Sequence, residues 1–249
     1  HYADVAAANI DTTISDGRDI ASIFRQLADV VDRLKESAHK ENENRDLMYH
    51  YEHDLGGFRK WWVETFGGEP PKPTSYKPDT SIDTTSLGHR ESTETRSGSM
   101  TVSSARPSTV RALSNTLANL GTSFDAEPGK LRNLSTEFMV KCQWGSVDAE
   151  NLISTFEAWN KSNANDKTWL GIVADTFEKY GSSSQIITVA NSTLEGAISA
   201  AGVSTERHDL EVPAPAVVGM STTSGYVNDP VNVATGNFIE SEVDLRSRV

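Results

Sequence analysis

The sequence predicts a mostly α-helical protein, built on a long antiparallel helical hairpin or bundle with a short β segment at the C-terminal end. Three observations support this class. Apolar residues recur every three or four positions over two long stretches, which places them on one helical face. Small residues separate the two stretches just after Trp144. Valines alternate near the C-terminal end, a pattern that is typical of a strand.

The N-terminal helical segment is predicted over residues 1–66. Ser15, Asp16 and Gly17 offer a helix cap at the start of its main stripe. The apolar residues of that stripe are Ile20, Ile23, Phe24, Leu27, Val30, Val31, Leu34 and Ala38. The run 41–46 is polar, and a second amphipathic stretch begins at Leu47, so two helical pieces are expected.

Residues 67–107 are predicted to be a linker. The segment is dominated by Ser, Thr, Pro and charged residues, and it has hardly any apolar side chain to pack. Such a composition does not offset the entropy cost of ordering the chain.

The helical hairpin is predicted over residues 108–202, with a kink or break at Pro128. The apolar residues of its first arm are Val110, Leu113, Leu117, Leu120, Phe124, Leu131, Leu134 and Phe138. Those of its second arm are Ala149, Leu152, Phe156, Trp159, Leu170, Val173, Phe177, Tyr180, Ile187, Leu194, Ile198 and Ala201, with a polar gap at 161–167. Left unbroken, the second arm would be about 75 Å long at roughly 1.5 Å per residue, ending at Gly202.

The bend between the arms consists of Trp144, Gly145 and Ser146, and Asp148 and Glu150 place negative charge where the next helix starts. This arrangement resembles the WXG family of helical-hairpin proteins exported by type VII secretion. The family's glycine falls on Ser146, and Gly145 takes the middle position. The resemblance covers about residues 108–202. Because it implies a hairpin that usually works as a dimer, one hypothesis is that residues 1–66 take the partner's place.

Residues 203–226 are predicted to be an extended linker, because Pro213 and Pro215 each disfavour helix at the preceding residue. Residues 227–249 read as a short β-hairpin with a turn around Gly236. This last stretch also closely resembles the opening of the rearrangement-hotspot (Rhs) repeat region, which leads into a large β-cage. The matching positions are Asp229, Pro230, Val231, Val233, Ala234, Thr235 and Gly236.

Together the two resemblances imply the N-terminal portion of a polymorphic toxin, in which a delivery domain precedes a repeat cage and a toxin domain. The expected function is a non-enzymatic targeting or secretion module for type VII-like export in interbacterial competition. Its partner would be the secretion machinery or a small helical export partner. The alternative is a structural plug or cap of the Rhs cage with no direct export role, held by the intrachain cage or by self-association.

Composition excludes some other functions. The net charge of −12 and a pI near 4.9 argue against nucleic acid as a partner, because phosphates need Lys and Arg. No apolar run reaches the roughly 20 residues that a membrane span requires. No cleavable signal peptide is recognisable, so a secreted protein would leave by another route.

The sequence offers little for catalysis or metal binding. His50 and His53 share one helical face, but no further His or Cys completes a metal site. No nucleophile motif or phosphate loop is present, so neither an enzyme activity nor a cofactor is expected. Trp61 and Trp62 are adjacent, and adjacent helical positions do not face the same core. One of the two is therefore a candidate partner contact.

Overall fold

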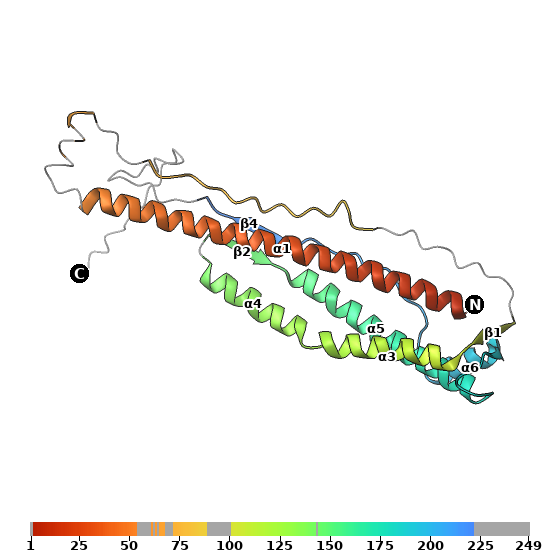
Figure 1. Cartoon of the computed structure of the whole chain (residues 1–249). Helices are drawn as coiled ribbons and strands as arrows, with labels where there is room; N and C mark the ends of the chain where they lie inside the picture. The colour runs from red at the N-terminus through yellow and green to blue at the C-terminus, as the bar shows by residue number, and fades with distance from the viewer. Residues whose placement is uncertain are drawn as a thin grey trace, which may run out of the picture. The chain divides into compact units, whose positions relative to one another are not determined.

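The computed structural model describes residues 2–53, 61, 63, 65–67, 72–88, 101–142 and 144–221, and the predicted mostly α-helical class is confirmed (Figure 1). The chain divides into two compact units. The first consists of His1–Gln26, Ile82–Glu137 and Asp148–Ala216, and the second of Leu27–Ser81, Phe138–Val147 and Val217–Val249.

Helix α1 (Tyr2–His53) is one uninterrupted helix, about 78 Å long at roughly 1.5 Å per residue. The predicted cap at Ser15 and the predicted separation into two pieces are therefore wrong. The physical reason is that the buried stripe of α1 continues through polar positions that the apolar pattern misses. These buried polar residues are Asn9, Asp16, Ser37, Glu41 and Asn44.

Helix α3 (Pro107–Phe124) packs along α5 (Glu150–Glu178) in the first unit. Proline suits the first turn of α3, where its missing amide costs nothing. α3 ends just before Pro128, close to the predicted break, and α4 (Glu127–Lys141) follows. α5 runs without interruption through the polar run 161–167, which was predicted as a gap in the stripe.

The predicted second arm does not continue as helix to Gly202. α5 ends at Glu178, and strand β3 (Ile187–Ala190) precedes a short helix, α6 (Asn191–Ala200). β3 pairs antiparallel with β1 (Val102–Ala105), which lies within the predicted linker. Alternate burial of Ile187 and Val189 explains why this stretch is a strand.

Gly202 ends α6 as predicted. Its φ of +66° is left-handed, a conformation that glycine adopts without steric cost. Its amide donates to the carbonyl of Ser199 at 2.9 Å, and the amide of Val203 donates to that of Ile198 at 3.4 Å. This pair of bonds is the Schellman motif, which satisfies the last carbonyls of the helix.

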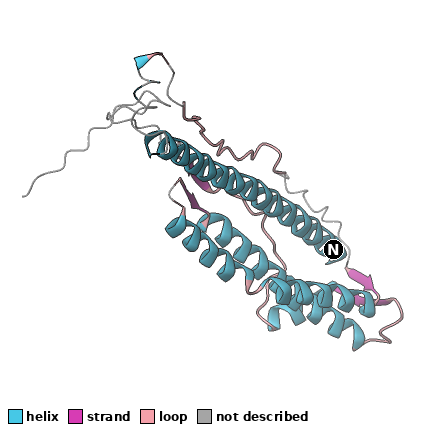
Figure 2. Ribbon diagram, turned by 60° about the vertical axis from the view of Figure 1, so that its left-hand side comes forward, coloured by secondary structure: helices cyan, strands magenta, loops and turns pink. Residues whose placement is uncertain are grey.

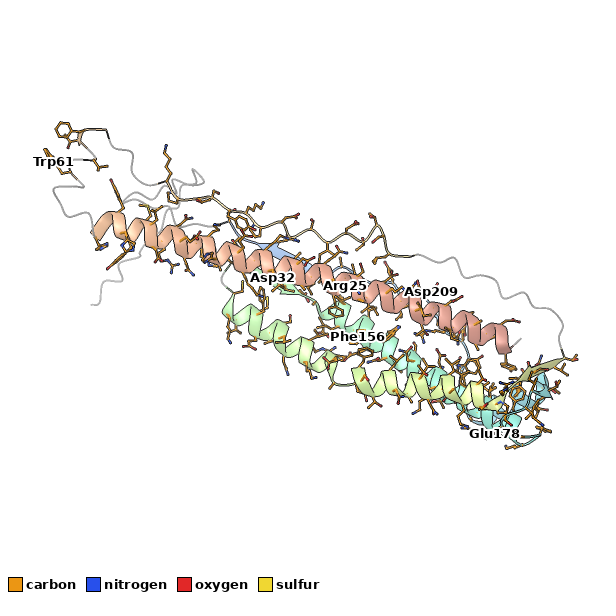
Figure 3. All side chains as sticks on the ribbon, viewed as in Figure 1. Arg25, Asp32, Trp61, Phe156, Glu178 and Asp209 are labelled. Atoms are coloured by element: carbon orange, nitrogen blue, oxygen red, sulfur yellow. The ribbon has the colours of Figure 1, made fainter. Side chains whose placement is uncertain are left out.

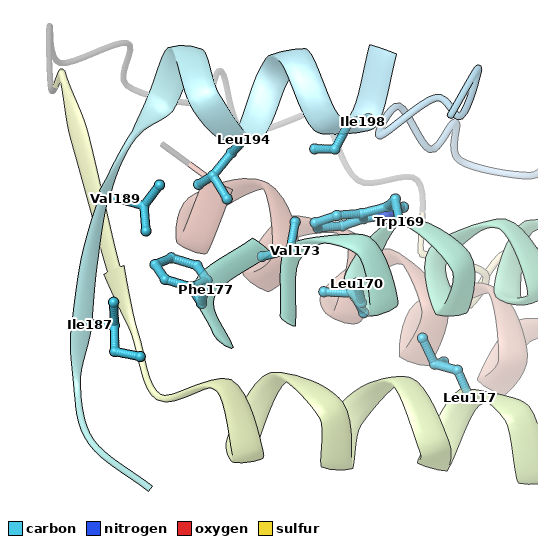
Figure 4. Close-up of a cluster of buried hydrophobic side chains, with 9 residues drawn as sticks. All are labelled: Leu117, Trp169, Leu170, Val173, Phe177, Ile187, Val189, Leu194 and Ile198. Atoms are coloured by element: carbon cyan, nitrogen blue, oxygen red, sulfur yellow. The ribbon is translucent and has the colours of Figure 1, made fainter. Parts of the chain in front are cut away.

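An apolar core joins α3, α5, β3 and α6 within the first unit (Figure 4). Trp169 and Phe177 are its largest fully buried side chains, and Tyr2, Val5 and Ala6 of α1 pack against it. The cluster consists of Leu117, Trp169, Leu170, Val173, Phe177, Ile187, Val189, Leu194 and Ile198. The helical period located most of these residues, because they face other helices.

The second unit contains the second half of α1, the end of α4 and segments without helix. Strand β2 (Gly145–Asp148) pairs with β4 (Ala216–Gly219). Residues 72–81 form neither helix nor strand and lie alongside α1, as the two views show (Figures 1 and 2). Extended chain therefore covers this part of α1.

Two glycines in helices predict opposite effects of the same substitution. Alanine normally stabilises a helix by about 0.5–1 kcal/mol relative to glycine. A Cβ at Gly17 would lie 3.1 Å from Cζ2 of Trp159, whose indole is held by a hydrogen bond to the Thr13 carbonyl, whereas a Cβ at Gly121 meets nothing within 4 Å. Gly121→Ala should raise the free energy of unfolding in urea, and Gly17→Ala should lower it by about 1–3 kcal/mol. Equal effects at both positions would contradict this packing.

Candidate functional site

The predicted bend is built as a strand rather than as a free turn. Trp144 is half-buried, and its carbonyl accepts a hydrogen bond of 2.9 Å from the amide of Met220. β2 begins at the next residue and pairs with β4. Chain from beyond the predicted hairpin therefore closes the bend.

Gly145 is the position of the bend where a side chain does not fit. A Cβ there would lie 2.6 Å from Cδ2 of Leu34 and 2.8 Å from the carbonyl oxygen of Val218. The resemblance placed the family's glycine on Ser146, which is only half-buried. In this chain the close approach of α1 and β4 instead explains the glycine in the middle position.

The predicted tryptophan contacts have different outcomes. Trp61 is 52% exposed, and its ring meets that of Phe66 edge to face at 5.9 Å between centroids (Figure 3). Trp62 lies outside the described residues. So do the Rhs-like positions Asp229, Pro230, Val231, Val233, Ala234, Thr235 and Gly236.

A buried polar cluster in the first unit was missed by the sequence reasoning. It joins α1, α5 and the segment after α6 through Asp166 and Arg207, whose side chains are 3% and 1% exposed and lie 2.7 Å apart. Asp166 also accepts hydrogen bonds from Asn9 at 3.1 Å and from the indole of Trp169 at 3.0 Å. Arg207 donates a second bond to the amide oxygen of Asn163 at 2.9 Å. The cluster anchors residues 203–210 by a charge that is neutralised inside the protein.

The same cluster holds polar atoms without a protein partner. They are Oδ2 of Asp16, Nδ2 of Asn163, and Nε and Nη2 of Arg207. Burial raises the pKa of Asp16 to about 6, although the Leu210 amide and the positive charge of Arg207 favour its ionised form. A carboxylate with an unpaired oxygen in this position is costly when ionised.

The histidines that the structure describes do not assemble a metal site. His53 stacks on Tyr49 at 4.4 Å between ring centroids, and its Nδ1 lies 3.1 Å from the Tyr49 carbonyl. Across the parts of the chain that the structure describes, no group of three His, Cys, Asp or Glu residues is placed to hold a metal ion. Among the described helices, none combines the length and the apolar character that crossing a bilayer requires.

Comparison with known proteins gives no relative: no protein-family model, curated protein or solved structure matches the chain.

The bend predicts a sharp difference between two neighbouring positions. Gly145→Ala should lower the free energy of unfolding by about 1–3 kcal/mol, because its Cβ meets backbone as well as Leu34. Ser146→Gly should cost no more than about 1 kcal/mol, the price of a more flexible strand residue. Urea unfolding of the two variants checks this. A harmless Gly145→Ala would mean that β4 does not sit against the bend.

Asp16 predicts an unusual pH dependence. Its pKa of about 6 in the fold exceeds the ordinary value of 3.8, so the folded state binds the proton more tightly. The stability that comes from protonated Asp16 is fully present below pH 3.8 and is lost as pH rises through 6. The loss in the free energy of unfolding is at most about 3 kcal/mol. Asp16→Asn should remove this loss and stabilise the protein at pH 7.5. The exposed Asp29→Asn is the control for the loss of one carboxylate and should not raise the melting temperature at pH 7.5.

Proposed function

We propose that this chain is the non-enzymatic N-terminal targeting module of an Rhs-family polymorphic toxin, exported by a type VII-like route in interbacterial competition. The observation that carries the proposal is the Trp144 bend between α4 and α5. The Rhs-like residues at 229–236 supply the second argument, from sequence alone.

In this proposal α3 with α4 and α5 are the two arms of a WXG-like hairpin. The contacts between the arms pair the start of the first arm with the end of the second. Arg111, near the start of α3, bonds Glu178 at the end of α5 at 2.8 Å. Arg132 in α4 bonds Glu150 at the start of α5 at 2.7 Å. Antiparallel arms joined near Trp144 are what the resemblance implies.

The first part of α1 takes the place that a partner hairpin would have. The ring of Phe24 meets that of Phe156 edge to face at 6.1 Å between centroids. The indole of Trp159 donates to the Thr13 carbonyl at 3.0 Å. Because one chain supplies these contacts, the surface for the secretion machinery or a small helical partner lies elsewhere, and the exposed Trp61 is our candidate.

A second candidate function is the structural plug or cap of the Rhs cage. It is favoured by the same α1 contacts, because a bundle that covers its own hairpin needs no export partner. Pull-down of the full chain from its native cytoplasm, with light scattering of the purified protein, separates the two functions. A bound small helical protein supports export, and a monomer without a partner supports the plug.

Export predicts a dependence on the machinery and on Trp61. The full chain should reach the culture medium of a strain with type VII secretion and stay inside an otherwise identical strain without it, with a cytoplasmic marker as the lysis control. Trp61→Ala should lower the secreted fraction several-fold without changing the melting temperature, because the side chain is exposed. Tyr180→Ala removes an aromatic that is more exposed than Trp61 and should have no effect. Equal amounts in both media would end the export proposal.

A further inference from the structure

The second half of α1 has a buried stripe that is partly polar. Its buried positions from Val30 onward alternate in steps of four and three residues, the spacing of one helical face. They are Val30, Leu34, Ser37, Glu41, Asn44, Met48 and Tyr51. A stripe that packs on another helix is mainly apolar. Extended chain contacts this face instead, because Ser37 donates to the Met220 carbonyl and Asn44 to the Thr74 carbonyl. Extended chain carries backbone groups that need partners.

Asn44 recognises the backbone of residue 74 at two points. Its Nδ2 donates to the Thr74 carbonyl at 2.8 Å, and its Oδ1 accepts from the Thr74 amide at 2.8 Å. The Asn44 residue is 3% exposed. Both bonds are made to backbone atoms. They therefore depend on the conformation of the chain at position 74 and not on its side chain.

Arg33 makes the next anchor on the same helix. Its Nε donates to the Asp79 carbonyl at 2.7 Å. Asn44 and Arg33 are eleven residues apart, roughly 16 Å along a helix. Thr74 and Asp79 are five residues apart, roughly 16 Å of extended polyproline-like chain. The distance between the two anchors on α1 therefore matches the distance between their partners in an extended peptide that runs antiparallel to the helix.

Prolines supply the apolar contacts of this peptide. Pro73 and Pro78 are buried, whereas Lys72, Ser75, Lys77 and Asp79 are exposed. Pro78 approaches β4 so closely that a Cβ at Gly219 would lie 2.5 Å from its Cγ. Buried prolines and hydrogen-bonded carbonyls are how grooves in proteins bind proline-containing extended peptides.

We propose that Arg33 and Asn44 of α1, together with Gly219 of β4, form a peptide-binding groove that exchanges its own segment 72–81 with that of a second copy of the chain. The occupant seen in the groove is the chain's own segment, so every second copy carries a fitting ligand. Intramolecular binding has the advantage of effective concentration. Exchange therefore becomes measurable when a chain's own segment is weakened or when protein concentration is high.

The groove and its ligand can be inactivated separately. Thr74→Pro with Pro78→Asp removes the amide that Asn44 binds and places a charge where a proline is buried, and it leaves α1 intact. Asn44→Ala breaks the groove and leaves the segment intact. Mixing the two full-length variants should give a 1:1 complex by light scattering, while each variant alone stays monomeric. Failure to associate, with both variants helical by circular dichroism, would overturn the exchange.

A labelled peptide of residues 72–82 tests the groove in a second way, because its first comparison leaves Asn44 unchanged. It should bind the full-length Thr74→Pro, Pro78→Asp chain and should bind the unaltered chain at least tenfold more weakly, because there the groove is occupied. Adding Asn44→Ala should abolish the binding, and adding Asn42→Ala, an exposed amide two residues away, should not. Absence of binding, or equal losses at both asparagines, would contradict the proposal. The test is independent of export, so its failure would leave the proposed function untouched.

Discussion

Backbone amides and carbonyls outside helices and sheets still need hydrogen-bond partners, and α1 supplies many of them in both units. Four polar side chains of α1 each bind the backbone of a segment far away in the sequence. The pairs are Asn9 with Thr205 and Gln26 with Asp83 in the first unit, and Ser37 with Met220 and Asn44 with Thr74 in the second. A helix covered by extended chain has to be polar at such positions, because an unpaired buried backbone group costs about 1–3 kcal/mol.

Apolar and polar burial have different roles in the first unit. The cluster around Trp169 and Phe177 buries large side chains against several elements and gives stability that does not depend on pH. The pair of Asp166 and Arg207 gives little net stability, because both charges lose their hydration. Removing either partner would still be expensive, since the other charge would stay buried alone. The pair therefore fixes where residues 203–210 lie on the bundle more than how stable the bundle is.

The apolar period was reliable where helices pack on helices and failed where they do not. It located Phe156, Trp159 and Leu170 in α5, all of which are buried. It treated 41–46 as a gap, although Glu41 and Asn44 are buried there, because their partner is extended chain and not an apolar face. A signal was available in the spacing of the polar residues themselves, which continues the stripe of α1. The strand around Ile187 was hidden for another reason, since a short apolar run fits helix and strand equally well.

The bend shows why a short motif predicts a place better than it predicts a contact. The spacing of Trp144 and the small residues after it located the break between α4 and α5. The approach of Leu34 and Val218 to Gly145, from the rest of the second unit, depends on the three-dimensional fold. With the Trp144 carbonyl bonded to Met220, recognition of this bend by another protein would use the half-buried indole and not the backbone at position 144. The short motif thus predicted where α5 begins, whereas the contact of β4 with the bend depends on residues more than seventy positions further along the chain.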